Sequence, residues 1–221
     1  FSIKPSFDLL DSLPSSAESV EGYEVIKESF PSGSFSPTYV YASFRQNPID
    51  SLGDIELVTA ELAGIEGVSR VSSPSRPFGT RLGMSMDEYV SSIYKLPPHV
   101  KDAILTNGSS SLEHLMLSGD LLPEYGQAAA HFTASNEFIS KFGDVVKMEV
   151  VLQGDPGDLE NLDRIAILRE HLTNIKPPSI QEIFVGGNSA IQYDTKVATA
   201  RDIRVITPIV LLIILIVLMI L

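Results

Sequence analysis

The C-terminal end of the chain constrains its fold most, because it is apolar without interruption. From Ile209 to Leu221 the sequence reads IVLLIILIVLMIL, with no polar residue. A helix of about 13 residues at ~1.5 Å per residue is roughly 20 Å long, whereas the hydrocarbon core of a bilayer is roughly 30 Å thick. Reading the helix back to Val205 adds one turn. We therefore predict a truncated transmembrane helix whose natural span continues past Leu221.

A buried core helix is the alternative for an apolar run of this length. A core helix normally keeps a polar stripe, whereas a helix that is apolar all round is typical of membrane burial. Pro208, near the start of the run, fits both alternatives because proline is tolerated in the first turn of a helix. The all-round apolar surface favours the membrane.

The composition of the chain restricts its partners and its chemistry. The formal net charge is −12, from 28 acidic and 16 basic residues. An acidic surface repels phosphate backbones, so we expect no nucleic-acid partner. The absence of cysteine excludes disulfides, thiolate metal sites and cysteine nucleophiles. The chain begins at Phe1 without a signal-like segment, so we expect an internal part of a longer polypeptide.

The first part of the chain, residues 1–77, contains a helix and then a strand–helix–strand unit. Serines before Glu18 have the spacing of a capping box, which predicts a helix over 17–29. Residues 38–44 alternate between apolar and other side chains, as a strand does. Ile55, Val58 and Leu62 recur at helical spacing within 50–63, and residues 68–72 alternate again.

Residues 78–143 have a different texture, with short helical pieces divided by prolines and glycines. Capping-box spacings from Ser85 to Glu88 and from Ser110 to Glu113 each predict the start of a short helix, and 128–142 is a third helical candidate. We interpret this region as a helical insertion.

Residues 144–188 repeat the strand–helix–strand order. Val146, Met148 and Val150 alternate within the strand predicted over 144–153. A turn over 155–158 follows, with Asp158 placed to cap the next helix, and residues 180–185 form a short strand. Two such units can interleave into a four-stranded antiparallel sheet with both helices on one face, the split βαβ (ferredoxin-like) arrangement of an α+β domain. Two unrelated α+β pieces are the alternative.

Residues 189–221 are predicted to form a connecting helix that continues into the membrane helix without a loop. We single out Gly186, Gly187, Asp194 and Pro208 as candidate turn or hinge positions. A bulky β-branched residue at a glycine with positive φ, as in Gly187→Val, is expected to impair folding or transport.

Chemical motifs are lacking elsewhere in the sequence. The four histidines have no metal-ligand spacing, and no nucleophile elbow, phosphate-binding loop or dinucleotide fingerprint occurs. We therefore predict no catalytic, cofactor-binding or metal-binding residues, no cofactor, and a protein that is not an enzyme.

Both ends of the chain resemble one family. Residues 9–14 (LLDSLP), Gly22, 30–33 (FPSG) and Pro37 are similar to the opening of the first extracytoplasmic loop of MmpL-like transporters of the resistance-nodulation-division (RND) superfamily. Residues 185–190 (VGGNSA), then Asp194, Asp202 and the apolar run, are similar to the return of that loop into the second membrane helix. The residues of the insertion carry no matching motif.

The resemblance implies an extracytoplasmic porter-type domain of a membrane exporter that uses an ion gradient to move hydrophobic or amphiphilic molecules such as lipids and drugs. The resemblance implies that the domain contacts the remaining transmembrane helices and the second loop domain of the same polypeptide. It also implies contact with the lipid bilayer and the substrate, and it allows a homo-oligomer. A membrane-anchored extracellular binding or receptor module is the alternative, and a membrane-anchored hydrolase would rest only on scattered Ser, His and Asp residues. Arg201 and Arg204 precede the span, and positive residues there favour a cytoplasmic location for that flank. Large domains, however, translocate largely regardless of charge.

Overall fold

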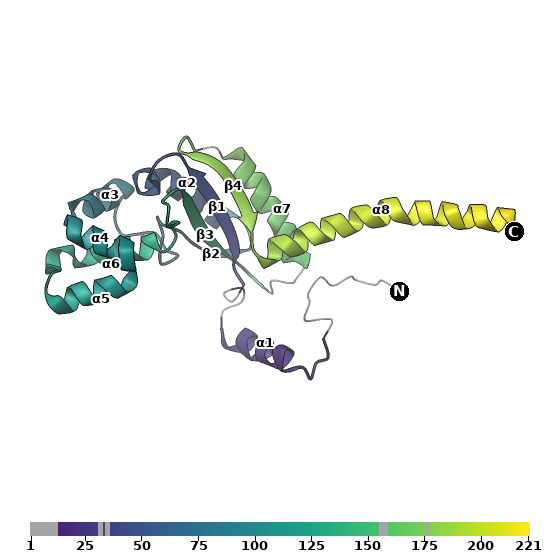
Figure 1. Ribbon diagram of the computed structural model, residues 1–221, viewed down its shortest axis with the longest axis horizontal. Coiled ribbons are helices and arrows are strands. Elements are labelled where there is room, and N and C mark those ends of the chain that lie inside the picture. Colours follow the sequence, from purple (N-terminus) through teal and green to yellow (C-terminus); the bar gives the residue numbers. More distant parts are fainter. Residues whose placement is uncertain (1–12, 31–32, 34–35, 155–158, 176) are drawn as a thin grey trace.

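The computed structural model describes residues 13–30, 33, 36–154, 159–175 and 177–221 (Figure 1). The turn predicted over 155–158, with its cap Asp158, and most of the motif at residues 9–14 lie outside these residues. The α-helices are α1 (Glu18–Ser29), α2 (Leu52–Gly64), α3 (Met86–Lys95), α4 (Pro98–Asn107), α5 (Ser109–Ser118), α6 (Gly126–Asn136), α7 (Leu159–Asn174) and α8 (Asn188–Ile220). The strands are β1 (Thr38–Phe44), β2 (Val68–Ser72), β3 (Val145–Leu152) and β4 (Ile180–Gly186), and short 3-10 turns cover Pro48–Ser51 and Pro123–Tyr125.

The four strands form one antiparallel sheet in the order β2-β3-β1-β4. In the centre of the sheet, Val40 of β1 lies opposite Met148 of β3 on one side and Val185 of β4 on the other. Each strand–helix–strand unit thus has a strand of the other unit between its own two strands. The predicted α+β class and the four predicted strands are confirmed.

One face of the sheet is buried under α2 and α7, which also contact each other. In β3, Val146, Met148 and Val150 are fully buried, as the period of two along a strand requires. The helices contribute Ile55, Val58 and Leu62 from α2 and Ile165 and Leu168 from α7, all of them fully buried. Burying an aliphatic side chain of this size is worth roughly 1.5–3 kcal/mol, so this layer joins the sheet and both helices into one body.

The opposite face of the sheet is open. Tyr41 and Phe184, neighbours in the pairing of β1 with β4, are both exposed. Beside them, the Lys147 ammonium lies 2.8 Å from a Glu149 carboxylate oxygen and 5.6 Å from the centre of the Tyr39 ring. This face is therefore mixed in character, with aromatic rings and an ion pair in contact with solvent.

Helices α3 to α6 follow β2 and precede β3, and they pack together at one end of the sheet (Figure 1). Buried polar contacts connect these helices to the segment after β2. The Tyr89 hydroxyl of α3 donates to the His131 carbonyl of α6 at 2.9 Å and lies 2.5 Å from Ser135 Oγ. Ser135 Oγ in turn donates to the Pro74 carbonyl at 2.7 Å. Burial raises the pKa of Tyr89 to about 12, so this hydroxyl keeps its proton at physiological pH.

Two of the three predicted capping boxes are wrong. Ser85 and Glu88 form both reciprocal hydrogen bonds at the start of α3. By contrast, α1 begins after Ala17 and α5 begins after Gly108, and neither helix has a side-chain cap. Gly108, and not the predicted Ser110, is the N-terminal cap of α5. The nearby Ser111 hydroxyl donates to the Ala103 carbonyl at 2.7 Å.

The predicted helix over 128–142 is also too long, and one helix of the insertion was missed. α6 ends at Asn136 because the next residues pair with β3: Phe138 accepts from the Lys147 amide at 2.8 Å, and Ser140 donates to the Val145 carbonyl at 2.8 Å. That helix is α4, which begins at Pro98 with Pro97 as its N-terminal cap, where the sequence predicts only a division between helical pieces. Proline fits the first turn of a helix, so the adjacent residues Pro97 and Pro98 mark the start of α4.

Helix α1 and the C-terminal part of α8 lie away from this body (Figure 1). α8 leaves the sheet as one long helix, and none of the residues of α1, all of which are described, is buried. The attachment of α8 to the sheet is therefore the candidate functional site.

Candidate functional site: the junction between sheet and membrane helix

A single residue separates the last strand from the long helix. β4 ends at Gly186, and Gly187 is the N-terminal cap of α8, with φ +100° and ψ 176°. This backbone conformation is open essentially to glycine alone. A Cβ on Gly187 would also lie 3.2 Å from the Pro37 carbonyl oxygen, so the glycine allows close approach to the segment before β1.

The first turns of α8 pack against the body of the protein. Ser189, Ala190 and Gln192 are buried at this contact, and α8 touches α7, β4 and β1. The rest of the helix is exposed from Val197 onward. The docked part therefore covers only the first turns of a helix of 33 residues.

Two ion pairs fasten these turns to α7. The Arg169 guanidinium donates to both oxygens of Asp194, at 2.6 and 3.0 Å, and its charged carbon lies 5.6 Å from the centre of the Tyr193 ring. Two residues further along α8, Lys196 donates to Asp163 at 2.6 Å. The bidentate geometry fixes the direction as well as the distance of the first pair.

The Arg169–Asp194 pair shifts the pKa values of both groups. The hydrogen bond from Arg169 lowers the pKa of Asp194, and the same bond raises the pKa of Arg169. Partial burial opposes both shifts but is the smaller effect. The pair is therefore charged on both sides at neutral pH.

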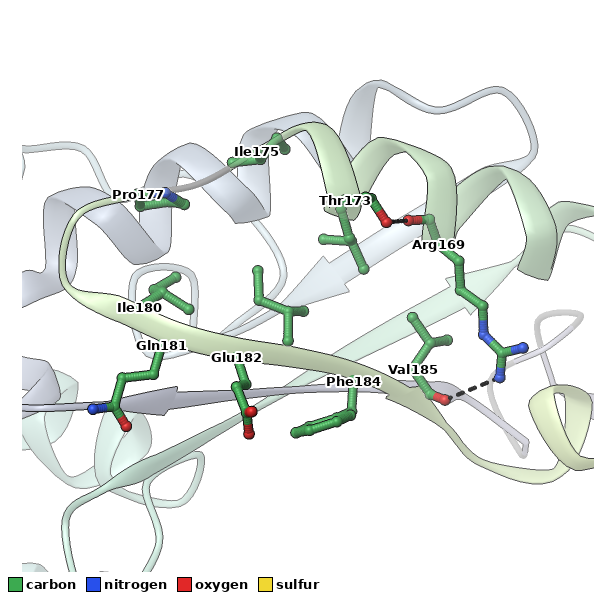
Figure 2. A pocket seen from close by; sticks show the side chains of 11 residues that line it. Arg169, Thr173, Ile175, Pro177, Ile180, Gln181, Glu182, Phe184 and Val185 are labelled. Atoms are coloured by element: carbon green, nitrogen blue, oxygen red, sulfur yellow. Dashed lines mark hydrogen bonds between the residues drawn. The ribbon is translucent and has the colours of Figure 1, made fainter.

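A groove of about 700 Å³ lies between α7 and β4, next to this junction (Figure 2). β4 is an edge strand, with β1 on one side only. On the other side, Arg169 donates weakly to the Val185 carbonyl at 3.5 Å, whereas Glu182 and Phe184 point away from α7 (Figure 2). Arg169 thus contacts both the end of the sheet and the start of α8.

Among the described residues, α8 is the one helix long and apolar enough to cross a membrane. Every residue of its apolar part, from Val205 to Leu221, is exposed to the surroundings. At ~1.5 Å per residue, the 33 residues of α8 measure roughly 50 Å. Helix α8 has no loop between its docked first turns and its apolar part.

Pro208 lies inside α8 rather than in a first turn of a separate membrane helix. Its ring nitrogen has no proton to donate, so the Arg204 carbonyl loses its usual partner within the helix. Pro208 is thus far from the junction that Gly186, Gly187 and Asp194 share. The hinge roles of these four residues stay predictions.

Sequence reasoning missed the partners on α7. Arg169 and Asp194 are 25 positions apart, and Asp163 and Lys196 are 33 apart. Charged residues on a helix are usually solvated, and no spacing rule links two helices separated by a strand. Only the docking of α8 on α7 brings these side chains together.

The described residues contain no group of three or more His, Cys, Asp or Glu side chains that could hold a metal ion. The junction instead consists of a sheet, a glycine and a clamped helix in series.

Comparison with known families agrees with this architecture. The sequence matches the model of the MMPL family over residues 11–221. No curated protein was found to be similar to the chain. Members of the MMPL family are RND-type membrane transporters and not enzymes, so the match does not favour the receptor-module alternative. With an exposed apolar helix and a family match over nearly its whole length, the chain belongs to the MMPL family of membrane transport proteins.

Proposed function

We propose that this chain is an extracytoplasmic porter-type domain of an ion-gradient-driven exporter, and that it couples domain movement to a membrane helix. The transported molecules would be hydrophobic or amphiphilic, as the family resemblance implies. The domain would contribute one wall of their path, and the ion-binding residues would lie in other membrane helices of the same polypeptide.

One observation carries this proposal: the sheet continues into the membrane helix through Gly187 alone, with the Arg169–Asp194 pair clamping the start of α8. A soluble module tethered only for retention needs no such connection, and a flexible linker would serve it. A clamped helix, by contrast, turns a movement of the domain into a movement of the span.

The strand order supports the porter-type fold within this proposal. An order of β2-β3-β1-β4, with α2 and α7 on one face, is that expected of the split βαβ arrangement. We take residues 1–77 and 144–188 as its two halves and 78–143 as an insertion. The second loop domain of the polypeptide, or another copy of the protein, would pack beside it.

A distance measurement tests the coupling. Spin labels on Glu170→Cys of α7 and Ala200→Cys of α8, both exposed positions, should give one narrow distance distribution in lipid nanodiscs. The chain has no native cysteine to interfere. Inserting Gly-Gly-Ser after Ala198 is the control and should broaden the distribution. A distribution in the native sequence as broad as in the control would refute rigid coupling.

A labelling experiment tests the orientation. Ser110→Cys, exposed on α5, should react with a membrane-impermeant maleimide in intact cells that express the full transporter. Reaction only after permeabilisation would place the domain in the cytoplasm and overturn the proposal.

A further inference from the structure

A second pocket, distant from the junction, lies between the helical insertion and the segment that leads into β3. It has a volume of about 610 Å³ and is lined by residues of α3, α4 and α6, by residues 139–143, and by Asn47 and Ile49 after β1. A volume of this size is in the range of small-molecule sites, roughly 300–1,000 Å³.

The interior of this pocket is apolar. Ile49, Ile93 and Phe132 line it and are 7%, 3% and 4% exposed. At the rim, Leu105 and Phe142 are 58% and 93% exposed, which is unusual for side chains of this kind. Exposed apolar groups beside an apolar interior are typical of sites that bind apolar molecules.

Two lysines, Lys101 and Lys141, also line the pocket. Neither forms an ion pair with any residue that the structure describes, whereas Lys147 and Lys196 both do. The Lys101 ammonium lies 5.8 Å from the centre of the Tyr94 ring, another lining residue. In a chain of net charge −12, two unpaired lysines in one pocket form a local cationic site.

No Asp or Glu is among the lining residues within the described part of the chain. Four acidic residues adjoin lining residues in the sequence: Asp50, Asp102, Glu137 and Asp144. Asp50 accepts a hydrogen bond from the Tyr94 hydroxyl, and Asp144 accepts one from Ser140 Oγ at 2.8 Å. Within the described lining, Lys101 and Lys141 are the charged groups that an anion would meet.

We propose that this pocket binds an anionic amphiphile, with its hydrocarbon chain against Ile93 and Phe132 and its acidic headgroup between Lys101 and Lys141. Charge complementarity and the apolar interior select this class over neutral lipids and over cationic amphiphiles. That the bound molecule is transported rests on the proposed function, whereas the binding itself does not.

Photo-crosslinking tests the binding with the complete chain in nanodiscs of phosphatidylcholine. The probe is dodecanoate carrying a diazirine, and labelled peptides are mapped by mass spectrometry. We expect labelling within residues 93–105 and 136–143, competition by unlabelled dodecanoate, and little competition by dodecyltrimethylammonium. Labelling confined to α8, or equal competition by both amphiphiles, would overturn the proposal.

Charge reversal gives the second arm. Lys101→Glu with Lys141→Glu should reduce pocket labelling roughly tenfold, since charged hydrogen bonds of this kind are lost. The matched control is Arg45→Glu with Lys95→Glu, which makes the same charge change at two exposed positions outside the pocket lining and should change labelling less than about twofold. Equal effects of the two pairs would show that only overall charge matters and would refute the site.

Raising the salt concentration needs no variant and separates binding from misfolding. Labelling of the native chain should fall as ionic strength rises from about 0.05 to about 0.5 M, because screening weakens the attraction of the lysines. Salt-independent labelling would contradict an anion site. Because the chain is tested in isolation, failure here is distinguishable from failure of the orientation or coupling experiments.

Discussion

At the scale of single residues, Gly187 is a position where a side chain is costly. Its backbone lies in a region that other residues avoid, and a Cβ would crowd the Pro37 carbonyl. We expect Gly187→Ala to lower the free energy of unfolding by about 1–3 kcal/mol. Urea denaturation of the chain in detergent micelles measures this.

Its neighbour provides the control for that substitution. Gly186 has no positive φ, and a Cβ there would meet only the Tyr41 ring, at 3.3 Å. Gly186→Ala should therefore cost clearly less than Gly187→Ala. Equal costs would mean that the backbone at Gly187 is not the cause.

Asp194 should make stability depend on pH. Its pKa is lower in the folded protein than in the unfolded chain, because Arg169 holds the charged form. Its contribution is therefore present above about pH 4, the unfolded value, and is lost as pH falls through the lower folded value. We expect Asp194→Asn to cost about 0.5–1 kcal/mol at pH 7, a small value because the side chain is 58% exposed and solvent screens the pair.

Denaturation curves of Asp194→Asn and the native chain, recorded between pH 7 and about pH 2, test this assignment. The difference between them should disappear at the acidic end. Asp202→Asn, on the exposed side of the same helix and without an ion pair among the described residues, should show no such pattern. A difference that persists at low pH would trace the cost to packing rather than to charge.

At the scale of elements, one ion pair secures α2 to the segment after β2. Arg76 donates to Glu56 from Nε at 3.0 Å and from Nη2 at 2.5 Å, and the Arg76 side chain is only 8% exposed. Removing the carboxylate leaves a guanidinium that is nearly buried without its partner. We expect Glu56→Ala to cost about 2–3 kcal/mol, below the roughly 3–5 of a fully buried pair, because Glu56 is 21% exposed.

The same helix carries the control for this prediction. Glu61 pairs with His171 at 2.8 Å, but both side chains are more than two-fifths exposed. Glu61→Ala should cost less than about 1 kcal/mol in the same urea titration. A cost at Glu56 no larger than that at Glu61 would show that burial of Arg76 does not matter.

Helices and strands whose apolar residues recur with a clear period could be predicted from the sequence, but the residues at which they begin and end could not. The alternation in β3 and the helical spacing in α2 follow from burial of one face, so both were found. The end of α6 depends on pairing of Phe138 with Lys147 of β3, which a local pattern does not contain. Of the three predicted capping boxes, the one at Ser85 is confirmed and the other two are not, because serines are common in this sequence and the start of α5 is set by Gly108.

At the scale of the whole molecule, the apolar part of α8 should hold the chain in a bilayer. Leu212→Lys together with Ile216→Lys would place two charges in the span, each costing about 2.5–3.5 kcal/mol near its centre. We expect this variant to lose most of its co-flotation with phosphatidylcholine liposomes. Val197→Lys with Ile203→Lys, also exposed on α8 but before the apolar run, should float like the native chain.

The candidate site could be predicted only where it is local in sequence. Gly186 and Gly187 stand out because they follow a strand, and the span stands out by composition. Arg169 and the pocket around Lys101 and Lys141 are assembled from distant segments. Their side chains meet through the packing of α8 on α7 and of the insertion on β3, and no sequence pattern records these contacts.

The unbroken course of α8 sets an angle as well as a distance. Each residue of a helix turns it by about 100° and advances it by ~1.5 Å. One residue inserted between Lys196 and Val205 would therefore rotate the membrane-embedded face by more than a quarter turn while barely changing its depth. Seven inserted residues would lengthen the helix by roughly 10 Å yet restore its facing to within ~20°. The number of residues between the Arg169–Asp194 pair and the bilayer thus fixes the rotation of the span about its axis. That rotation decides which side of the span faces its neighbours.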